Sequence, residues 1–472
     1  MKFAPLIALL FLTTSSFAKR PHILLVMADD MGWGQTGYYN HPVLKTPNLD
    51  AMAAKGLRFD RFYAGAPNCS PTRATVLTGR SNDRTGVENH GYPLRLQEKT
   101  VATALRDAGY RTAHFGKWHL NGLRGAGAPI LKGDTHDPGA FGFEDWLSVT
   151  NFFDMNPILS RKGEFEEFKG DSSEIVAAEA MKYFREHKDG EQPVFSVVWF
   201  STPHSPFVAS EEDKAAFGDL KEASANHYGE LVAMDRAIGA MRAGLREMGI
   251  AEDTLFWFCS DNGGLPEVKP SSTGGLRGHK GSVYEGGLRV PAIIEWPAGI
   301  KPARVTNHPA GTVDIFPTIA AVAGLPASAM LKPLDGMDLT ALFSEDVKER
   351  RQPLFFRHQN RGVVVDNRFK LVALKMDQPK FALYNLEVDA AETTDVSAEH
   401  PEIAKRLRDA LEKWNASVEA SVAGKDYPEG KVDPNQPERR MWADDPAYAP
   451  YLVEWKDRPE FKKFIKGKRK LK

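Results

Sequence analysis

The chain is poor in cysteine, with only Cys69 and Cys259 among its 472 residues. Two cysteines exclude a scaffold held by several disulfides and allow one bridge at most. Cys259 ends the apolar, strand-like run Thr254–Cys259, so it suits a buried core thiol better than a bridge to Cys69. We therefore expect packing, rather than disulfides, to hold the core together.

The sequence also lacks a large charge of one sign and, beyond its first residues, a long apolar run. A formal net charge of −1 creates no overall field for a polyanion, so nucleic acid is not an expected partner and anion binding must come from a local cluster of cations. No apolar run is long enough to span a bilayer. Lys2, the run Phe3–Leu12 and Ser16-Phe17-Ala18 instead predict a secretory signal over residues 1–18. We expect an exported protein, periplasmic or secreted, without a membrane span.

The composition, with 42% hydrophobic and 26% charged residues, is that of an ordinary globular protein long enough for two domains. Buried-strand runs such as His22–Met27 and Val194–Phe200 predict an α/β catalytic domain over residues 19–350. After residue 350 the pattern changes to short strands followed by one helix, Pro401–Val418. This change predicts a small C-terminal α+β subdomain over residues 351–425, with an antiparallel sheet.

Two segments show little periodicity. Gly122–Gly170 is rich in Gly, Pro, Asp and aromatic residues, and we expect long loops that lie over the site and set substrate choice. Residues 426–472 form a Pro-rich, charged tail that ends in the basic run Lys466–Lys472. We expect this tail to have a solvated end rather than to act as a nucleic-acid arm.

Paired oxygen ligands follow two of the predicted strands. Asp29-Asp30 comes after His22–Met27, and Asp261-Asn262 comes after Thr254–Cys259. Strand ends of this kind are where open α/β sheets build their sites. Carboxylate and amide oxygens favour a hard cation such as Ca²⁺ or Mg²⁺. Taken singly, each pair is also compatible with a plain polar turn, so the spacing alone leaves both interpretations open.

Cys69 stands where a loop turns into a helix, in the run Asn68–Arg80. Pro71 fits an early helical position, and Gly79 is a plausible stop. A side chain at such a helix start faces free backbone N–H groups, so we expect a thiol with a lowered pKa that is reactive. Arg73 adds a guanidinium suited to a tetrahedral oxyanion. The alternative is a half-buried structural cysteine.

Three more segments carry basic groups at strand ends or in loops. Lys117 and His119 lie two apart after a short strand, so an extended backbone would direct both to the same side. His204 stands between Pro203 and Pro206 after Val194–Phe200, where a structural histidine is the default interpretation. Lys280 lies in a glycine-punctuated basic loop that has no other assignment. A cation beside an imidazole suits oxyanion stabilisation and proton transfer.

Cys69-Ser70-Pro71-Thr72-Arg73, followed by a helix ending in Thr78-Gly79-Arg80, resembles the signature of the formylglycine-dependent (type I) sulfatases. Thr72 replaces the commoner Ser and keeps the hydroxyl. Further segments match the family in the same order along the chain: Asp29-Asp30, Gly116-Lys117-Trp118-His119, Pro203-His204-Ser205-Pro206, Ser260-Asp261-Asn262-Gly263 and the Lys280 loop.

The resemblance implies an alkaline-phosphatase-like fold, with a large mixed, mostly parallel sheet between helices. It implies that a formylglycine-generating maturation enzyme converts Cys69 to 3-oxoalanine, whose hydrate is the nucleophile. Asp29, Asp30, Asp261, Asn262 and residue 69 itself would hold one divalent cation, either Ca²⁺ or Mg²⁺, with oxygen-rich ligation leaning to Ca²⁺. Arg73, Lys117 and Lys280 would hold the sulfate, His204 with Lys280 would serve the leaving group, and His119 would deprotonate the second hydroxyl. The implied substrate is a sulfated carbohydrate or an aryl sulfate.

Two other functions are compatible with the same residues. One is a phosphate or phosphonate monoester hydrolase of the same superfamily, some members of which share the nucleophile signature. The other is a relative that binds sulfated glycans without turnover because Cys69 is never modified. Relative turnover of an aryl sulfate and an aryl phosphate, and binding without turnover, distinguish these alternatives.

Overall fold

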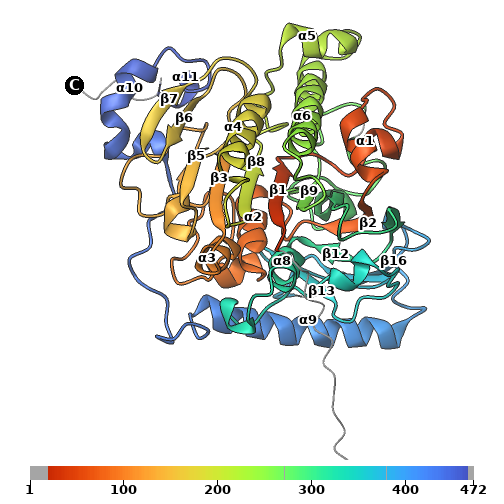
Figure 1. Ribbon diagram of the computed structural model, residues 1–472. Coiled ribbons are helices and arrows are strands. Elements are labelled where there is room, and N and C mark those ends of the chain that lie inside the picture. The colour runs from red at the N-terminus through yellow and green to blue at the C-terminus, as the bar shows by residue number, and fades with distance from the viewer. Residues whose placement is uncertain (1–19, 271, 379, 466–472) are drawn as a thin grey trace, which may run out of the picture.

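The computed structural model describes residues 20–270, 272–378 and 380–465 (Figure 1). The predicted secretory signal over residues 1–18 and the basic run Lys466–Lys472 therefore lie outside the described residues. In the part of the chain that is described, no helix is long and apolar enough to cross a membrane.

The catalytic part is built around four parallel strands that lie side by side in the order β9 (Thr254–Ser260), β1 (His22–Ala28), β8 (Val194–Trp199) and β3 (Arg111–Lys117). Nearly every residue of these strands is buried, and accordingly β9, β1 and β8 are almost continuously apolar, whereas β3 also carries buried polar residues such as Thr112 and His114. Within the described residues the full sheet has 11 strands. The other strands are β10 (Arg289–Glu295), β2 (Leu57–Tyr63), β11 (Arg304–Thr306) and β12 (Ala310–Gly311) beyond β9, and β5 (Asp145–Val149), β6 (Ile158–Arg161) and β7 (Glu164–Glu167) beyond β3.

Helices cover both faces of this sheet (Figure 1). In β1, Ile23, Leu25 and Met27 belong to one apolar cluster and the alternate residues belong to another. The first cluster includes α2 (Cys69–Thr78), α3 (Val101–Asp107) and α8 (Ile315–Val322), and the second includes α1 (Pro47–Ala53), α4 (Ser172–His187) and α6 (Glu222–Glu247). Each fully buried aliphatic side chain contributes about 1.5–3 kcal/mol to such packing. The predicted fold, a mostly parallel sheet between helices, is confirmed.

Short helices occupy the connections: α5 (Glu211–Lys214), α7 (Glu285–Leu288), η1 (Gly37–Tyr39), η2 (Asn82–Thr85), η3 (Pro138–Phe141), η4 (Ala215–Phe217), η5 (Thr312–Asp314), η6 (Ala327–Ala329), η7 (Thr340–Phe343), η8 (Trp442–Asp444) and η9 (Pro446–Tyr448). The second sheet is antiparallel, in the order β13 (Leu354–His358), β14 (Arg361–Asp366), β15 (Phe369–Ala373) and β16 (Phe381–Asn385). Helix α9 (Pro401–Val422) covers it with Leu407, Leu411 and Val418. This arrangement is the predicted C-terminal α+β fold.

The prediction of long loops over Gly122–Gly170 is wrong in part. Strand β5 extends the main sheet in parallel to β3, and β6 and β7 follow it as antiparallel strands. These strands are four or five residues long, and Gly163 lies between β6 and β7. Segments that short show no usable periodicity, so their pairing depends on the neighbouring β3.

Residues 440–465 of the predicted tail are folded, whereas its basic end, for which a solvated position is expected, lies outside the described residues. Strand β17 (Arg440–Met441) pairs in parallel with β4 (Leu123–Arg124). Helices α10 (Ala449–Trp455) and α11 (Lys462–Ile465) follow and lie near β6 and β7 (Figure 1). Trp442, Trp455 and other aromatic residues of this segment form one buried cluster with Leu123, Phe152 and Ile158.

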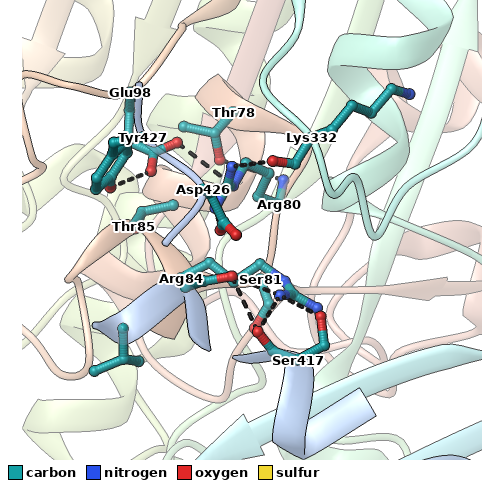
Figure 2. A network of polar contacts seen from close by, with 12 residues as sticks. Thr78, Arg80, Ser81, Arg84, Thr85, Glu98, Lys332, Ser417, Asp426 and Tyr427 are labelled. Carbon is teal, nitrogen blue, oxygen red and sulfur yellow. Dashed lines mark hydrogen bonds and ion pairs between the residues drawn. The ribbon is translucent and has the colours of Figure 1, made fainter. Parts of the chain in front are cut away.

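A buried polar network also ties the start of the tail to the end of α2 (Figure 2). The guanidinium of Arg80 lies 2.6 Å from the carboxylate of Asp426 and 3.6 Å from that of Glu98, which accepts a 2.6 Å hydrogen bond from the Tyr427 hydroxyl. Arg84 donates to the carbonyl and hydroxyl oxygens of Ser417 in α9 at 3.0 and 3.1 Å. The helix that begins with Cys69 is therefore fixed at its far end by α9 and the tail.

Candidate active site

The site lies where the four central parallel strands end at the same edge of the sheet. Asp29 follows β1, Asp261 follows β9, Lys117 is the last residue of β3, and His204 lies on the loop after β8. Residues from four distant parts of the sequence meet here because parallel neighbours present their carboxyl ends together.

The four predicted oxygen ligands are buried and in mutual contact. The backbone N–H of Asp30 donates to Oδ1 of Asp261 at 3.0 Å, and the amide of Asn262 donates to Oδ1 of Asp30 at 2.8 Å. Asp30 adopts a φ of 70°, a left-handed conformation that costs an Asp about 1–3 kcal/mol and that such sites tolerate. Among the described residues, Oδ1 of Asp29 and Oδ1 of Asn262 are buried without a hydrogen-bond partner.

These oxygens suit a hard cation. Asp29, Asp30 and His204 offer ligand atoms that all lie within 4.8 Å of one another. His204 was not among the predicted ligands, and Asp261 stands outside this compact group. Burial and then the charge of Asp29 raise the pKa of Asp261 to about 7. A buried carboxylate beside others is costly unless a positive charge neutralises it, so the donor set fits a divalent ion.

Three basic side chains each contact one of the carboxylates. Nζ of Lys117 lies 2.5 Å from Oδ2 of Asp29, and Nζ of Lys280 lies 2.7 Å from a carboxylate oxygen of Asp30. Nη2 of Arg73 lies 2.8 Å from Oδ2 of Asp261 and 3.7 Å from Oδ1 of Asp29. Burial raises the pKa of Asp29, but Lys117 and the other cations outweigh it, so this carboxyl titrates below its ordinary range. Lys280 also borders a cavity of about 510 Å³ lined in part by Tyr284 and Arg361.

Cys69 is the first residue of α2 and is only 2% exposed. Its Sγ lies 3.3 Å from Nδ1 of His119, and it is a free thiol, as is Cys259, so the two do not form a bridge. The predicted lowering of the thiol pKa is wrong. Burial raises the pKa of Cys69, and the nearby Lys117 and Lys280 only partly offset this effect.

His119 reaches the site through an unusual backbone turn after Lys117. It adopts a φ of 56°, and its carbonyl accepts a 2.7 Å hydrogen bond from the hydroxyl of Ser70. Lys117 and His119 thus both reach the site, Lys117 at Asp29 and His119 at Cys69. Burial, then Lys117, lowers the pKa of His119 well below its ordinary value. A neutral imidazole beside residue 69 is a proton acceptor.

With this geometry established, comparison with known proteins assigns the family. The sulfatase family model matches residues 21–325, and the model of the N-sulphoglucosamine sulphohydrolase C-terminal region matches residues 278–417. Arylsulfatase A of Homo sapiens is 34% identical over 385 residues, which cover 72% of this chain and 71% of that protein. The chain belongs to the sulfatase family. N-acetylgalactosamine-6-sulfatase of Canis lupus familiaris is similarly related, at 32% identity over 371 residues covering 71% of this chain and 68% of that protein.

Solved structures show that this sulfatase shares the alkaline-phosphatase-like fold predicted from its motifs. The structure of Ps i-CgsB in complex with k-i-k-neocarrahexaose matches with a TM-score of 0.74 at 24% identity, covering 95% of this chain and all of that one. The phosphonate monoester hydrolase of Agrobacterium radiobacter matches with a TM-score of 0.58 at 21% identity, covering 85% of this chain and 96% of that one. At identities below 25%, these structural matches show a shared fold and nothing about substrate.

The sulfatase site also contains two residues, Phe152 and His90, that no sequence motif indicated. His204 is stacked on Phe152, and its Nδ1 donates to the carbonyl of Ser205 at 2.6 Å, which directs Nε2 to a point 3.8 Å from Oδ2 of Asp30. Burial, then Lys280, lowers the pKa of His204 to about 4. His90 lies beside His119, with ring centroids 6.4 Å apart. Phe152 and His90 stand in irregular segments, so only the folded chain reveals their place.

Proposed function

We propose that this sulfatase hydrolyses the sulfate ester of a carbohydrate, or an aryl sulfate, and releases inorganic sulfate. A maturation enzyme would first convert Cys69 to 3-oxoalanine. The observation that carries the proposal is the position of Cys69 at the start of α2, beside His119 and within the electrostatic reach of Lys117 and Lys280. The hydrate of the aldehyde supplies an oxygen nucleophile and a second hydroxyl with which sulfate can be expelled, which a thiol lacks.

Asp29, Asp30, Asp261 and Asn262, together with residue 69, would hold one divalent cation. The unpartnered oxygens of Asp29 and Asn262 support this set, and a set of several protein oxygens favours Ca²⁺ over Mg²⁺, which usually keeps several of its waters. When bound, the cation supplies positive charge to the reacting oxygens. Because it also neutralises the carboxylates, the charges of Arg73, Lys117 and Lys280 become available to an anion.

The other side chains of the site bind the sulfate, assist the leaving oxygen and accept a proton from residue 69. Arg73, Lys117 and Lys280 bind the non-bridging oxygens of the sulfate and orient it in line with residue 69. Lys280, which stays protonated beside Asp30, provides the proton for the leaving oxygen, and His204, whose Nε2 faces the site, contacts the same oxygen. His119 is neutral and accepts a proton from the second hydroxyl at residue 69.

The substrate class is proposed from chemistry and from the names of relatives. The protein is proposed to be exported, a location that suits sulfated poly- or oligosaccharide. N-acetylgalactosamine-6-sulfatases are among its relatives at 32% identity. A neighbour in fold at 19% identity is described in complex with D-glucosamine-2-N,6-O-disulfate. These names support a sulfated sugar without selecting the sugar or the sulfate position.

The test combines the chemical state of residue 69 with turnover. Mass spectrometry of the tryptic peptide that contains residue 69 should show the aldehyde or its hydrate in an active preparation. The same preparation should release sulfate from 4-nitrophenyl sulfate much faster than phosphate from 4-nitrophenyl phosphate. An active preparation that retains only the thiol, or one that prefers the phosphate, contradicts the proposal. A Cys69→Ala variant is the control for turnover by contaminants.

A further inference from the structure

Two arginines from distant parts of the chain meet beside the proposed active site. Arg124 lies in β4, and Arg439 immediately precedes β17, which pairs with β4. Nε of Arg439 donates to the carbonyl of His90 at 2.8 Å, and its Nη2 lies 3.2 Å from Nε2 of the same residue. The guanidinium of Arg439 also stacks over Tyr92, 5.2 Å from the ring centroid.

These two cations have no counter-charge of their own. Among the described residues, neither Arg124 nor Arg439 forms an ion pair with a carboxylate, and Nε of Arg124 is buried without a hydrogen-bond partner. Burial and then the charge of Arg124 lower the pKa of Arg439, as two like charges close together do. Like charges held together in this way favour the binding of an anion.

The pair lies close to residue 69. The segment that carries His90 rests on the start of α2, because the N–H of Gly91 donates to the hydroxyl of Ser70 at 2.8 Å and the amide of Asn68 donates to Asn89 at 2.7 Å. A Cβ at Gly91 would stand 2.4 Å from Cγ of Arg124, so the arginine stem packs directly on this segment. On the other side, His90 is next to His119, which contacts Cys69.

We propose that Arg124 and Arg439, with His90 between them and the catalytic groups, form a subsite for a second anionic group of the substrate. The ligand chemistry is an oxyanion, either a further sulfate ester or a carboxylate, carried on the same sugar as the scissile sulfate or on the adjoining one. This inference rests on the proposed hydrolysis of a sulfated saccharide. It adds a preference for substrates that bear at least two negative charges.

The subsite depends on the segment that follows the matched family regions, which end at residue 417. Arg439 belongs to that segment, and the pairing of Arg440 with Leu123 and of Met441 with Arg124 brings it to β4. The matched family regions thus provide the catalytic groups and Arg124, and the C-terminal segment after residue 417 provides Arg439. This division explains why neither arginine stood out in the sequence.

The test measures competitive inhibition of 4-nitrophenyl sulfate hydrolysis, which itself needs no second anion. Galactose 6-sulfate, galactose 2,6-disulfate and a glucuronate-containing disaccharide with one sulfate serve as inhibitors. In the wild-type enzyme at least one doubly charged inhibitor should bind about tenfold more tightly than the singly charged one, as a charged hydrogen bond allows. The disulfate and the glucuronate arms distinguish a sulfate from a carboxylate at the subsite.

Arg439→Gln and Arg124→Gln should each remove most of that difference and leave kcat on 4-nitrophenyl sulfate within about twofold. Arg439→Lys keeps the charge and loses the planar fork, so it should retain part of the difference. Arg440→Gln is the matched control, because the neighbouring Arg440 is already paired with Asp445 at 2.5 Å. Equal inhibition by all three saccharides in the wild-type enzyme, or unchanged selectivity in both Gln variants, overturns the subsite. Absence of 4-nitrophenyl sulfate turnover in a matured wild-type preparation would instead count against the proposed function.

Discussion

Phe152 lies face to face with His204, with ring centroids 4.6 Å apart and ring planes 11° apart. Phe152 also belongs to the buried cluster that contains Trp442 and Trp455. One face of the imidazole is thus held by a side chain that the C-terminal segment supports. The orientation of His204 is therefore linked to the packing of residues more than 200 positions away in the sequence.

Phe152→Ala should release the imidazole of His204 and weaken its contact with the leaving oxygen. We expect a loss of about tenfold in kcat for an alkyl sulfate, since one hydrogen bond contributes about 0.5–1.5 kcal/mol. The loss for 4-nitrophenyl sulfate should be smaller, because 4-nitrophenolate leaves without a proton. Phe152→Tyr keeps the ring and is the control. Equal losses on both substrates would contradict a role in orienting His204.

Trp442→Ala should destabilise the folded protein by about 3–5 kcal/mol, the usual cost of removing a large buried aromatic side chain. Trp442 is fully buried and contacts Tyr448, Trp455 and Phe461. Val453→Ala, in the same segment but 71% exposed, should change stability by no more than about 0.5 kcal/mol. Denaturant unfolding of the two variants and the wild type gives the comparison. Similar stabilities would mean that the C-terminal segment is not an integrated part of the core.

Removal of divalent ions should abolish turnover and lower the unfolding temperature together. Asp29, Asp30 and Asp261 are all buried, and the cation would neutralise them. At a concentration of 100 times its Kd, returned Ca²⁺ should stabilise the protein by about 2.7 kcal/mol. Calorimetry and sulfate release after chelation and after addition of Ca²⁺ or Mg²⁺ measure both effects. Full activity of a thoroughly chelated sample would exclude the metal from the mechanism.

Asp171 makes stability depend on pH. It caps α4 by accepting hydrogen bonds from the backbone of Ser173 and Glu174, and burial raises its pKa from 3.8 to about 6. The charges of Glu174 and Asp213 add to the rise, and Asp154 also lies near. Below about pH 3 the carboxyl is protonated in both folded and unfolded chains. As the pH rises to 6 the unfolded chain loses the proton first, so the folded state becomes less stable by about 3 kcal/mol.

Asp171→Asn preserves the cap and removes the ionisation. The stability of this variant relative to the wild type should therefore rise between about pH 4 and pH 6 and then stay level. Asp189→Asn, at an exposed position, should show a difference that stays within about 0.5 kcal/mol at every pH. Urea unfolding at several pH values provides the curves. A flat difference for Asp171→Asn would mean that its carboxyl is not perturbed.

The sequence predicted those parts of the molecule that short-range patterns determine. Continuous apolar runs identified the central strands, and polar residues directly after them, such as Asp29 and Asp261, identified the edge where the site lies. The thiol pKa was mispredicted because a helix start can be buried as well as polar, and burial at Cys69 is the larger effect. The position of Arg439 beside Arg124 could not be predicted from the sequence, because it depends on the pairing of two short strands, β4 and β17.

Cys69 is 2% exposed and the whole of α2 is buried. An enzyme that acts on this side chain has to reach it while the polypeptide is still extended, during or soon after synthesis. Once the native state forms, the Cys69 side chain is no longer accessible to such an enzyme. If Cys69 is converted as proposed, a host cell that lacks the converting enzyme would yield a protein with normal folding and unfolding temperature but without turnover, so correct folding does not report on activity.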